Sequence, residues 1–211
     1  MKRIVILIDG TWDEEGVGNN TNVAILSGDN KRPLIKTCDS HGVKQLVVYH
    51  KGVGTEKDWL KHILGGTIGL GLKQIVLDAY ASLTELYESG DDIFAIGFSR
   101  GAYAARALVG MIGASGIVRD PSPAKTQAAW NHYRVPPSVR AAPQAASGSN
   151  ARAIRNMKAL RQAGDVHADN RVKCVGVWDT VGSYGVPAGI GLAPLARYIA
   201  LASLGFHDTH L

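Results

Sequence analysis

The strongest chemical signal in this 211-residue chain is a serine between two glycines, in the pentapeptide Gly97-Phe98-Ser99-Arg100-Gly101. The stretch before it, 92–96, is apolar and β-branched as in a buried strand, and the stretch after it, 102–111, is rich in helix formers. A strand, a tight turn and a helix in this order are typical of a nucleophile elbow, in which a strained serine lifts its hydroxyl clear of the sheet. We therefore predict that Ser99 is a nucleophile; the alternative is that it only caps the helix.

A serine hydroxyl is a poor nucleophile by itself, so this interpretation requires an acid, a histidine base and an oxyanion hole. Asp179 is the expected acid, because it follows Ser99 in the chain and lies just past a predicted strand at 171–178. Its role would be to orient the histidine and stabilise the imidazolium. The alternative is an aspartate that caps the loop after the strand.

The oxyanion donors are expected to be the backbone N–H groups of Gly10 or Thr11, together with that of Arg100. Gly10 and Thr11 follow Asp9 at the end of a predicted first strand, 4–8. In open α/β sheets the chemistry gathers beyond the carboxyl ends of the strands. Asp9 and the predicted nucleophile and acid should therefore share one edge of the sheet.

The prediction also requires a histidine base that follows the acid in the chain. His207 and His210 follow Asp179 and so satisfy the order serine, acid, histidine. Both lie next to the last residue of the chain, and terminal segments are often too poorly ordered to position a base. We take His207 as the candidate, with a base beyond Leu211 as the alternative.

Strands alternate with helices along the chain, which predicts an α/β fold with a mostly parallel sheet and helices on both faces. Strands are expected at 4–8, 45–49, 92–96 and 171–178, and helices at 23–27, 72–88, 102–111, 124–133 and 151–163. A glycine-rich turn is expected at 65–71 and a proline- and alanine-rich loop at 136–150. We predict a single domain over 1–211 that carries an insertion or lid at 120–170.

Composition indicates a globular domain and a cytoplasmic product. Hydrophobic residues make up 45% of the chain, and no apolar run is long enough to span a membrane. The first residues have too short an apolar core for a signal peptide, and the two cysteines, Cys38 and Cys174, suit reduced thiols. No sequence feature calls for a metal or an organic cofactor.

Basic residues concentrate between Arg134 and Arg171, in a chain with a net charge of +5. The plain interpretation is a solvated helical face; the functional one is a basic collar that favours anionic membrane lipids. Nucleic acid is not an expected partner, because no zinc-finger spacing or aromatic RNA-binding signature accompanies the charge.

Two rival chemistries lack residues that their motifs require. Asp9-Gly10-Thr11 is similar to the haloacid-dehalogenase phosphatase motif, but Leu7 stands where that motif needs its nucleophilic aspartate. The glycine-rich stretch 66–73 is similar to a phosphate loop, but Leu72 separates glycine from lysine and Gln74 replaces the magnesium-binding Ser or Thr.

Five motifs together resemble one family, the α/β-hydrolase-like catalytic domain of type VI secretion phospholipase effectors. They occur in the family's order from residue 8 to the 180s: Ile8-Asp9-Gly10-Thr11-Trp12, Thr21-Asn22-Val23, Tyr49-His50-Lys51-Gly52-Val53-Gly54-Thr55, Ile96-Gly97-Phe98-Ser99-Arg100-Gly101-Ala102 and Val177-Trp178-Asp179-Thr180-Val181-Gly182.

The resemblance implies a serine esterase or lipase acting on glycerophospholipid esters through an acyl-serine, with Ser99 as nucleophile and Asp179 as acid. It also implies export without a signal peptide, and a secretion-apparatus or immunity protein as partner. The family's histidine follows a Phe-His-Asp-Thr-like segment, and this sequence stops at Leu211 soon after its own, so we expect the chain to be incomplete at its C-terminus. The alternative is a non-catalytic or incomplete hydrolase-fold module that binds a lipid or a protein.

Overall fold

A parallel sheet forms the centre of the protein. The computed structural model describes residues 1–10, 21–28, 34–52 and 68–180. Within them, β1 (Arg3–Ile8), β2 (Gln45–His50), β3 (Asp92–Phe98) and β4 (Arg171–Trp178) form a sheet in the order β2-β1-β3-β4, and every neighbouring pair is parallel. The predicted α/β class with a parallel sheet is confirmed.

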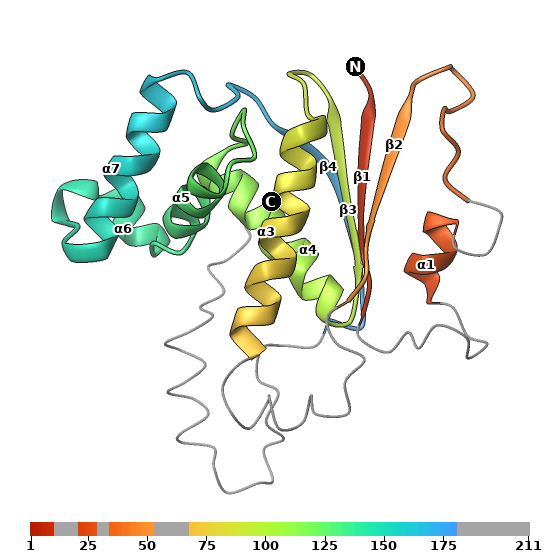
Figure 1. Ribbon diagram of the computed structural model, residues 1–211, viewed down its shortest axis with the longest axis horizontal. Helices are drawn as coiled ribbons and strands as arrows, with labels where there is room; N and C mark the ends of the chain where they lie inside the picture. Colours follow the sequence, from red (N-terminus) through yellow and green to blue (C-terminus); the bar gives the residue numbers. More distant parts are fainter. Residues whose placement is uncertain (11–20, 29–33, 53–67, 181–211) are drawn as a thin grey trace, which may run out of the picture.

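Helices cover both faces of this sheet (Figure 1). The short helix α1 (Asn22–Ser27) lies on one face, and the long helices α3 (Ile68–Leu86) and α4 (Arg100–Ser115) lie on the other. Successive side chains of a strand point to opposite faces, so a strand covered on both sides must be apolar throughout. β1 meets this requirement, with burial over Ile4–Ile8.

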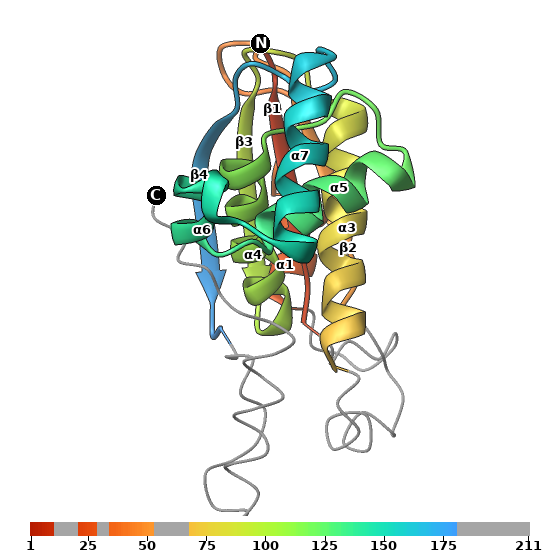
Figure 2. The same ribbon diagram turned by 90° about the vertical axis from the view of Figure 1, so that its left-hand side faces the viewer.

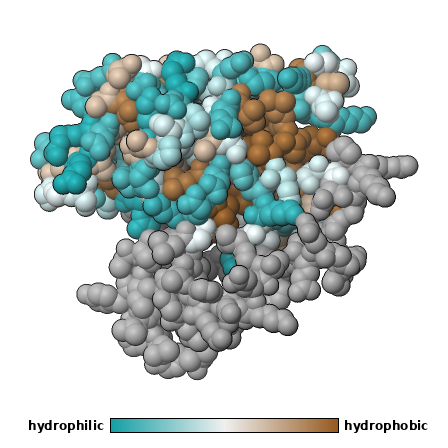
Figure 3. Space-filling view, in the orientation of Figure 1, coloured by the Kyte–Doolittle hydropathy of each residue, from teal (hydrophilic) through white to brown (hydrophobic). Residues whose placement is uncertain are grey.

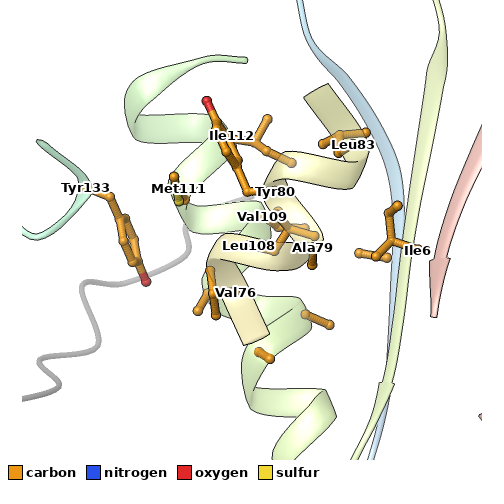
Figure 4. Close-up of a cluster of buried hydrophobic side chains, with 14 of the residues drawn as sticks. Ile6, Val76, Ala79, Tyr80, Leu83, Leu108, Val109, Met111, Ile112 and Tyr133 are labelled. Carbon is orange, nitrogen blue, oxygen red and sulfur yellow. The ribbon is translucent and has the colours of Figure 1, made fainter. Parts of the chain in front are cut away.

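The larger core lies between the sheet and the two long helices. Figure 4 shows Ile6 of β1 facing Leu83 of α3 and Leu108 of α4, with Tyr80 and Ile112 packed behind them. All five side chains are fully buried. The smaller core, on the α1 face, is built on Val5, Leu7 and Val23.

The predicted insertion is helical. It contains α5 (Pro123–Tyr133), α6 (Pro137–Ala141), the short 3-10 helix η1 (Pro143–Ala145) and α7 (Gly148–Gln162). Figures 1 and 2 show these helices as an outer layer beside α4 and α3, away from the carboxyl ends of the strands. That the segment also closes over the site as a lid stays a prediction, as does the single-domain assignment.

The structure corrects three local predictions. α3 begins at Ile68, inside the expected turn, because burial of its apolar face outweighs the poor helix propensity of two glycines. The expected loop at 136–150 contains α6 and η1, each with a proline at its start, where the missing N–H costs nothing. α4 is longer than the expected 102–111 and begins immediately after Ser99.

The first prediction concerns Gly101, where α4 meets β1. A Cβ on Gly101 would lie 2.1 Å from the Ile8 carbonyl oxygen and 2.6 Å from that of Asp9. Gly101→Ala should therefore lower the free energy of unfolding by on the order of 3 kcal/mol, measured by urea denaturation. Gly113 of the same helix is the control, because a Cβ there has nothing within 4 Å, so Gly113→Ala should stabilise by about 1 kcal/mol. Equal effects at both glycines would contradict the close contact.

Candidate active site

Ser99 occupies the turn between β3 and α4 in a strained conformation. Its φ is 54° and its ψ is −116°, a region that residues with a side chain rarely adopt. Its N–H donates to the Trp178 carbonyl oxygen at 3.0 Å, and its own carbonyl accepts from the Tyr103 N–H at 3.3 Å. Its side chain makes no capping hydrogen bond to α4. This geometry favours the elbow over the cap that the sequence left open.

The glycines on either side of Ser99 make the turn possible. A Cβ on Gly97 would lie 2.3 Å from the Gly101 carbonyl oxygen, and one on Gly101 would strike the end of β1. The strand, the turn and the helix can therefore approach closely only because both positions lack side chains. This is the spatial reason for the spacing of the GxSxG motif.

Asp179 immediately follows β4, the neighbour of the strand that ends just before Ser99. β3 and β4 are paired up to Phe98 and Trp178, so the residues after them leave the sheet side by side. Asp179 also has a positive φ, of 48°, and in the described chain it shares this property only with Ser99 among non-glycine residues. Its side chain is exposed. Because Asp9 follows β1 in the same parallel sheet, the predicted shared edge is confirmed.

Asp9 is hydrogen-bonded to three neighbouring segments of the described chain. The carboxylate is 1% exposed and accepts hydrogen bonds from the Gly10 N–H at 2.7 Å, the Tyr49 hydroxyl at 2.7 Å and the Thr21 hydroxyl. Thr21 also accepts from the Ala24 N–H at 3.0 Å as the N-cap of α1. A buried carboxylate is stable only when such donors satisfy it. Asp9 therefore ties β1, β2 and α1 together beside Ser99.

The two described oxyanion candidates differ in availability. The Gly10 N–H already donates to Asp9 Oδ1, so it cannot receive an oxyanion unless that hydrogen bond breaks. Arg100 is the first residue of α4, where a backbone N–H has no partner within the helix. Its guanidinium is half-buried, and this burial lowers its pKa. Thr11 lies outside the described residues.

His50 ends β2 at the same edge, and its Nε2 is buried without a hydrogen-bond partner in the described chain. Burial lowers the pKa of this imidazole, and Asp78 of α3 acts in the opposite direction. β2 is three strand positions from β4, a span of about 14 Å. His50 therefore cannot bridge Ser99 and Asp179.

The other described histidines lie away from this edge. His132 contacts the Ser115 hydroxyl through Nδ1 at 3.2 Å, at the far end of α4, and burial lowers its pKa to about 4. His167 precedes β4, and its backbone N–H donates to the Ile117 carbonyl oxygen. His207, the predicted base, lies outside the described residues.

Sequence reasoning missed the contacts that brace the edge. Thr21, Tyr49 and Gly52 were quoted as members of the family motifs, but none of them was given a role in the site. A Cβ on Gly52 would lie 2.2 Å from the Gly10 carbonyl oxygen. The polar side chains next to buried strands were the available signal, but their partner at Asp9 depends on tertiary packing.

The described ranges contain neither a cluster of metal ligands nor a membrane-spanning helix. Among residues 1–10, 21–28, 34–52 and 68–180, no group of three His, Cys, Asp or Glu side chains is arranged to hold a metal ion. No helix in those ranges has the length and apolar character needed to cross a bilayer.

A parallel α/β sheet with a strained serine at its carboxyl edge is the arrangement of a hydrolase-like domain. The chain belongs to the family of type VI secretion system Tle1-like phospholipase effectors, catalytic domain, whose sequence pattern matches residues 2–211. The resemblance drawn from the five motifs is confirmed. The family is one of phospholipase effectors, which supports a lipase-like function at the level of the family.

Comparison with curated proteins finds a yeast relative, the uncharacterized protein YEL023C of Saccharomyces cerevisiae. The two are 29% identical over 145 residues, which cover 63% of this chain and 20% of the relative. The chain therefore spans about a fifth of the length of this relative. No solved structure gives a significant match.

The second prediction concerns the strain at Ser99. Glycine adopts its backbone conformation without the cost that a Cβ imposes, whereas alanine does not. Ser99→Gly should therefore have a free energy of unfolding about 1 kcal/mol higher than Ser99→Ala. Chemical denaturation of the two variants measures the difference. A lower stability of Ser99→Gly would contradict the strained geometry.

Proposed function

We propose that this protein is a serine carboxylic-ester hydrolase that cleaves glycerophospholipid esters through an acyl-serine intermediate. The observation that carries the proposal is the positive φ of Ser99, at the carboxyl edge of a parallel sheet and without a capping bond. Strained backbone conformations of this kind are found at active sites, where they can expose a nucleophile. Membership of a phospholipase effector family supports the lipid substrate.

The proposed reaction has two balanced steps. Ser99 Oγ attacks the ester carbonyl as the imidazole takes its proton, and the C–O bond to the lysophospholipid breaks as that alcohol receives the proton. Water then attacks the acyl-serine with help from the same imidazole. This releases a fatty acid and restores the serine, so no other reactant is consumed.

Asp179 is the proposed acid and His207 the proposed base, with a histidine beyond Leu211 as the alternative. The neighbouring ends of β3 and β4 support the pairing of Ser99 with Asp179. An imidazole between them must come from chain outside the described residues, because His50 is separated from β4 by two strands.

For the oxyanion hole we propose the N–H groups of Arg100 and Thr11. Arg100 begins α4, where the helix dipole also favours negative charge. Gly10 contributes mainly by its lack of a side chain: a Cβ there would lie 2.9 Å from the Phe98 ring and 3.3 Å from the Ser99 Cβ. The hydrogen bond from the Gly10 N–H to Asp9 fixes the residue that precedes Thr11.

We also propose a route of export and a protein partner, on the basis of the family. The effector family supports export from the cytoplasm by a signal-peptide-independent secretion system, with a secretion-apparatus component or an immunity protein as partner. The phospholipid itself is the main proposed ligand. The proposed chemistry uses neither a metal nor an organic cofactor.

A second candidate is a non-catalytic module that binds a lipid or a protein. It is favoured by one observation: none of the described histidines is placed in space where its ring could bridge the side chains of Ser99 and Asp179. The two candidates differ in the reactivity of Ser99, which is high only if a base activates it.

The third prediction is that Ser99→Ala abolishes ester turnover. Loss of the nucleophile should reduce kcat for phospholipid and for a short-chain nitrophenyl ester by about 10⁴-fold or more. Ser138→Ala, at an exposed serine of α6, is the matched control and should keep full activity. Turnover by Ser99→Ala equal to that of the unaltered protein would remove the mechanism.

The fourth prediction is that a fluorophosphonate probe labels Ser99 alone. These probes phosphonylate serines that a neighbouring base activates, with loss of fluoride, so the adduct reports the base without requiring the natural substrate. Mass spectrometry of the digested protein should place the adduct on the peptide that contains Ser99. Absence of labelling at this serine would favour the non-catalytic module.

A further inference from the structure

The segment 121–164 has an unusual charge composition. It holds seven of the chain's 23 Lys and Arg residues and none of its 18 Asp and Glu residues. The rest of the chain has 16 basic and 18 acidic residues, so the positive net charge of the protein comes entirely from this segment. We call it the acid-free segment; it spans α5, α6, η1 and α7.

Some of these cations are already used within the fold. Lys125 pairs with Asp120 at 3.2 Å and with Asp165 at 3.0 Å, both just outside the segment. Arg161 donates to the carbonyl oxygens of Ala114 and Ser115 at the end of α4. These residues have structural partners and need no external anion.

Three cations on α7 make no such contacts in the described structure. Arg152, Arg155 and Lys158 are exposed, follow one another at intervals of three residues, and make no hydrogen bond or ion pair to another residue by side chain in the described structure. Residues three apart are neighbours on a helix surface, so their charges repel one another. An external anionic surface would relieve this repulsion.

The buried side of α7 limits how this helix can contact an anionic surface. Ala153 and Met157 are buried against the rest of the protein, so α7 has no free apolar face to insert into a membrane. Figure 2 shows α7 in the layer nearest the viewer, and the corresponding left side of the molecule in Figure 3 is largely hydrophilic. A partner would therefore be held by charge alone.

We propose that Arg152, Arg155 and Lys158 form a docking surface for an anionic lipid bilayer. This inference rests on the proposed function, because an enzyme that cleaves phospholipids must reach a membrane. Nucleic acid fits less well, since binding of single strands uses exposed aromatic rings, and the rings of Trp130 and Tyr133 in this segment are buried. Acidic headgroups need only the charges that α7 exposes.

The fifth prediction tests this surface by vesicle co-sedimentation, with the Ser99→Ala chain so that lipid is not consumed. The chain should bind vesicles that contain phosphatidylglycerol and should not bind phosphatidylcholine alone. Arg152→Glu/Arg155→Glu/Lys158→Glu should weaken binding by on the order of 100-fold or more. Binding of the unaltered surface should vanish near 1 M salt, where the screening length is about 3 Å.

The matched control is Lys36→Glu/Lys44→Glu/Lys173→Glu, which makes the same change in net charge at exposed positions outside the segment. It should bind within about twofold of the parent. Equal losses in both triple variants, unchanged binding of the α7 variant, or binding to single-stranded DNA in place of vesicles would each overturn the proposal. Because binding is measured without turnover, its failure is distinguishable from a failure of the esterase mechanism.

Discussion

The contact between the first turn of α4 and the end of β1 constrains the carboxyl edge of the sheet, where the candidate site lies. Gly101 brings the helix so close to the Ile8 and Asp9 carbonyls that no side chain fits between them. The chain must then reverse from β3 into α4 within one residue, and Ser99 takes the positive φ that this reversal demands. Backbone packing, rather than any feature of the serine itself, thus sets the conformation of Ser99.

The buried network at Asp9 supports this contact from the other side. Its three donors come from the loop after β1, from β2 and from the start of α1, so one carboxylate joins segments that are far apart in the sequence. Lone pairs left unsatisfied there would cost more than the hydrogen bonds gain, which makes the arrangement specific as well as stable. The predicted acid, by contrast, is exposed just past β4, the last strand in the order of the described sheet.

The exposed cations and the candidate nucleophile and acid lie in different parts of this fold. The sheet carries the candidate nucleophile and acid, while the acid-free segment packs its apolar side chains on α3 and α4 and turns its unpaired cations outward. A helix whose apolar side is already buried acts as a rigid carrier of charge. The same burial that stabilises α7 therefore limits it to electrostatic contacts with a partner.

The sequence by itself determined the parts whose signal is local. β4 was predicted with its observed bounds, α1 within one residue of them, and the strand, turn and helix around Ser99 in their observed order, because periodicity and glycine spacing act over a few residues. Tertiary structure alone decided the partners of Asp9, the engagement of the Gly10 amide and the separation of His50 from Asp179. Those depend on strand order and on contacts across many residues, which no local pattern encodes.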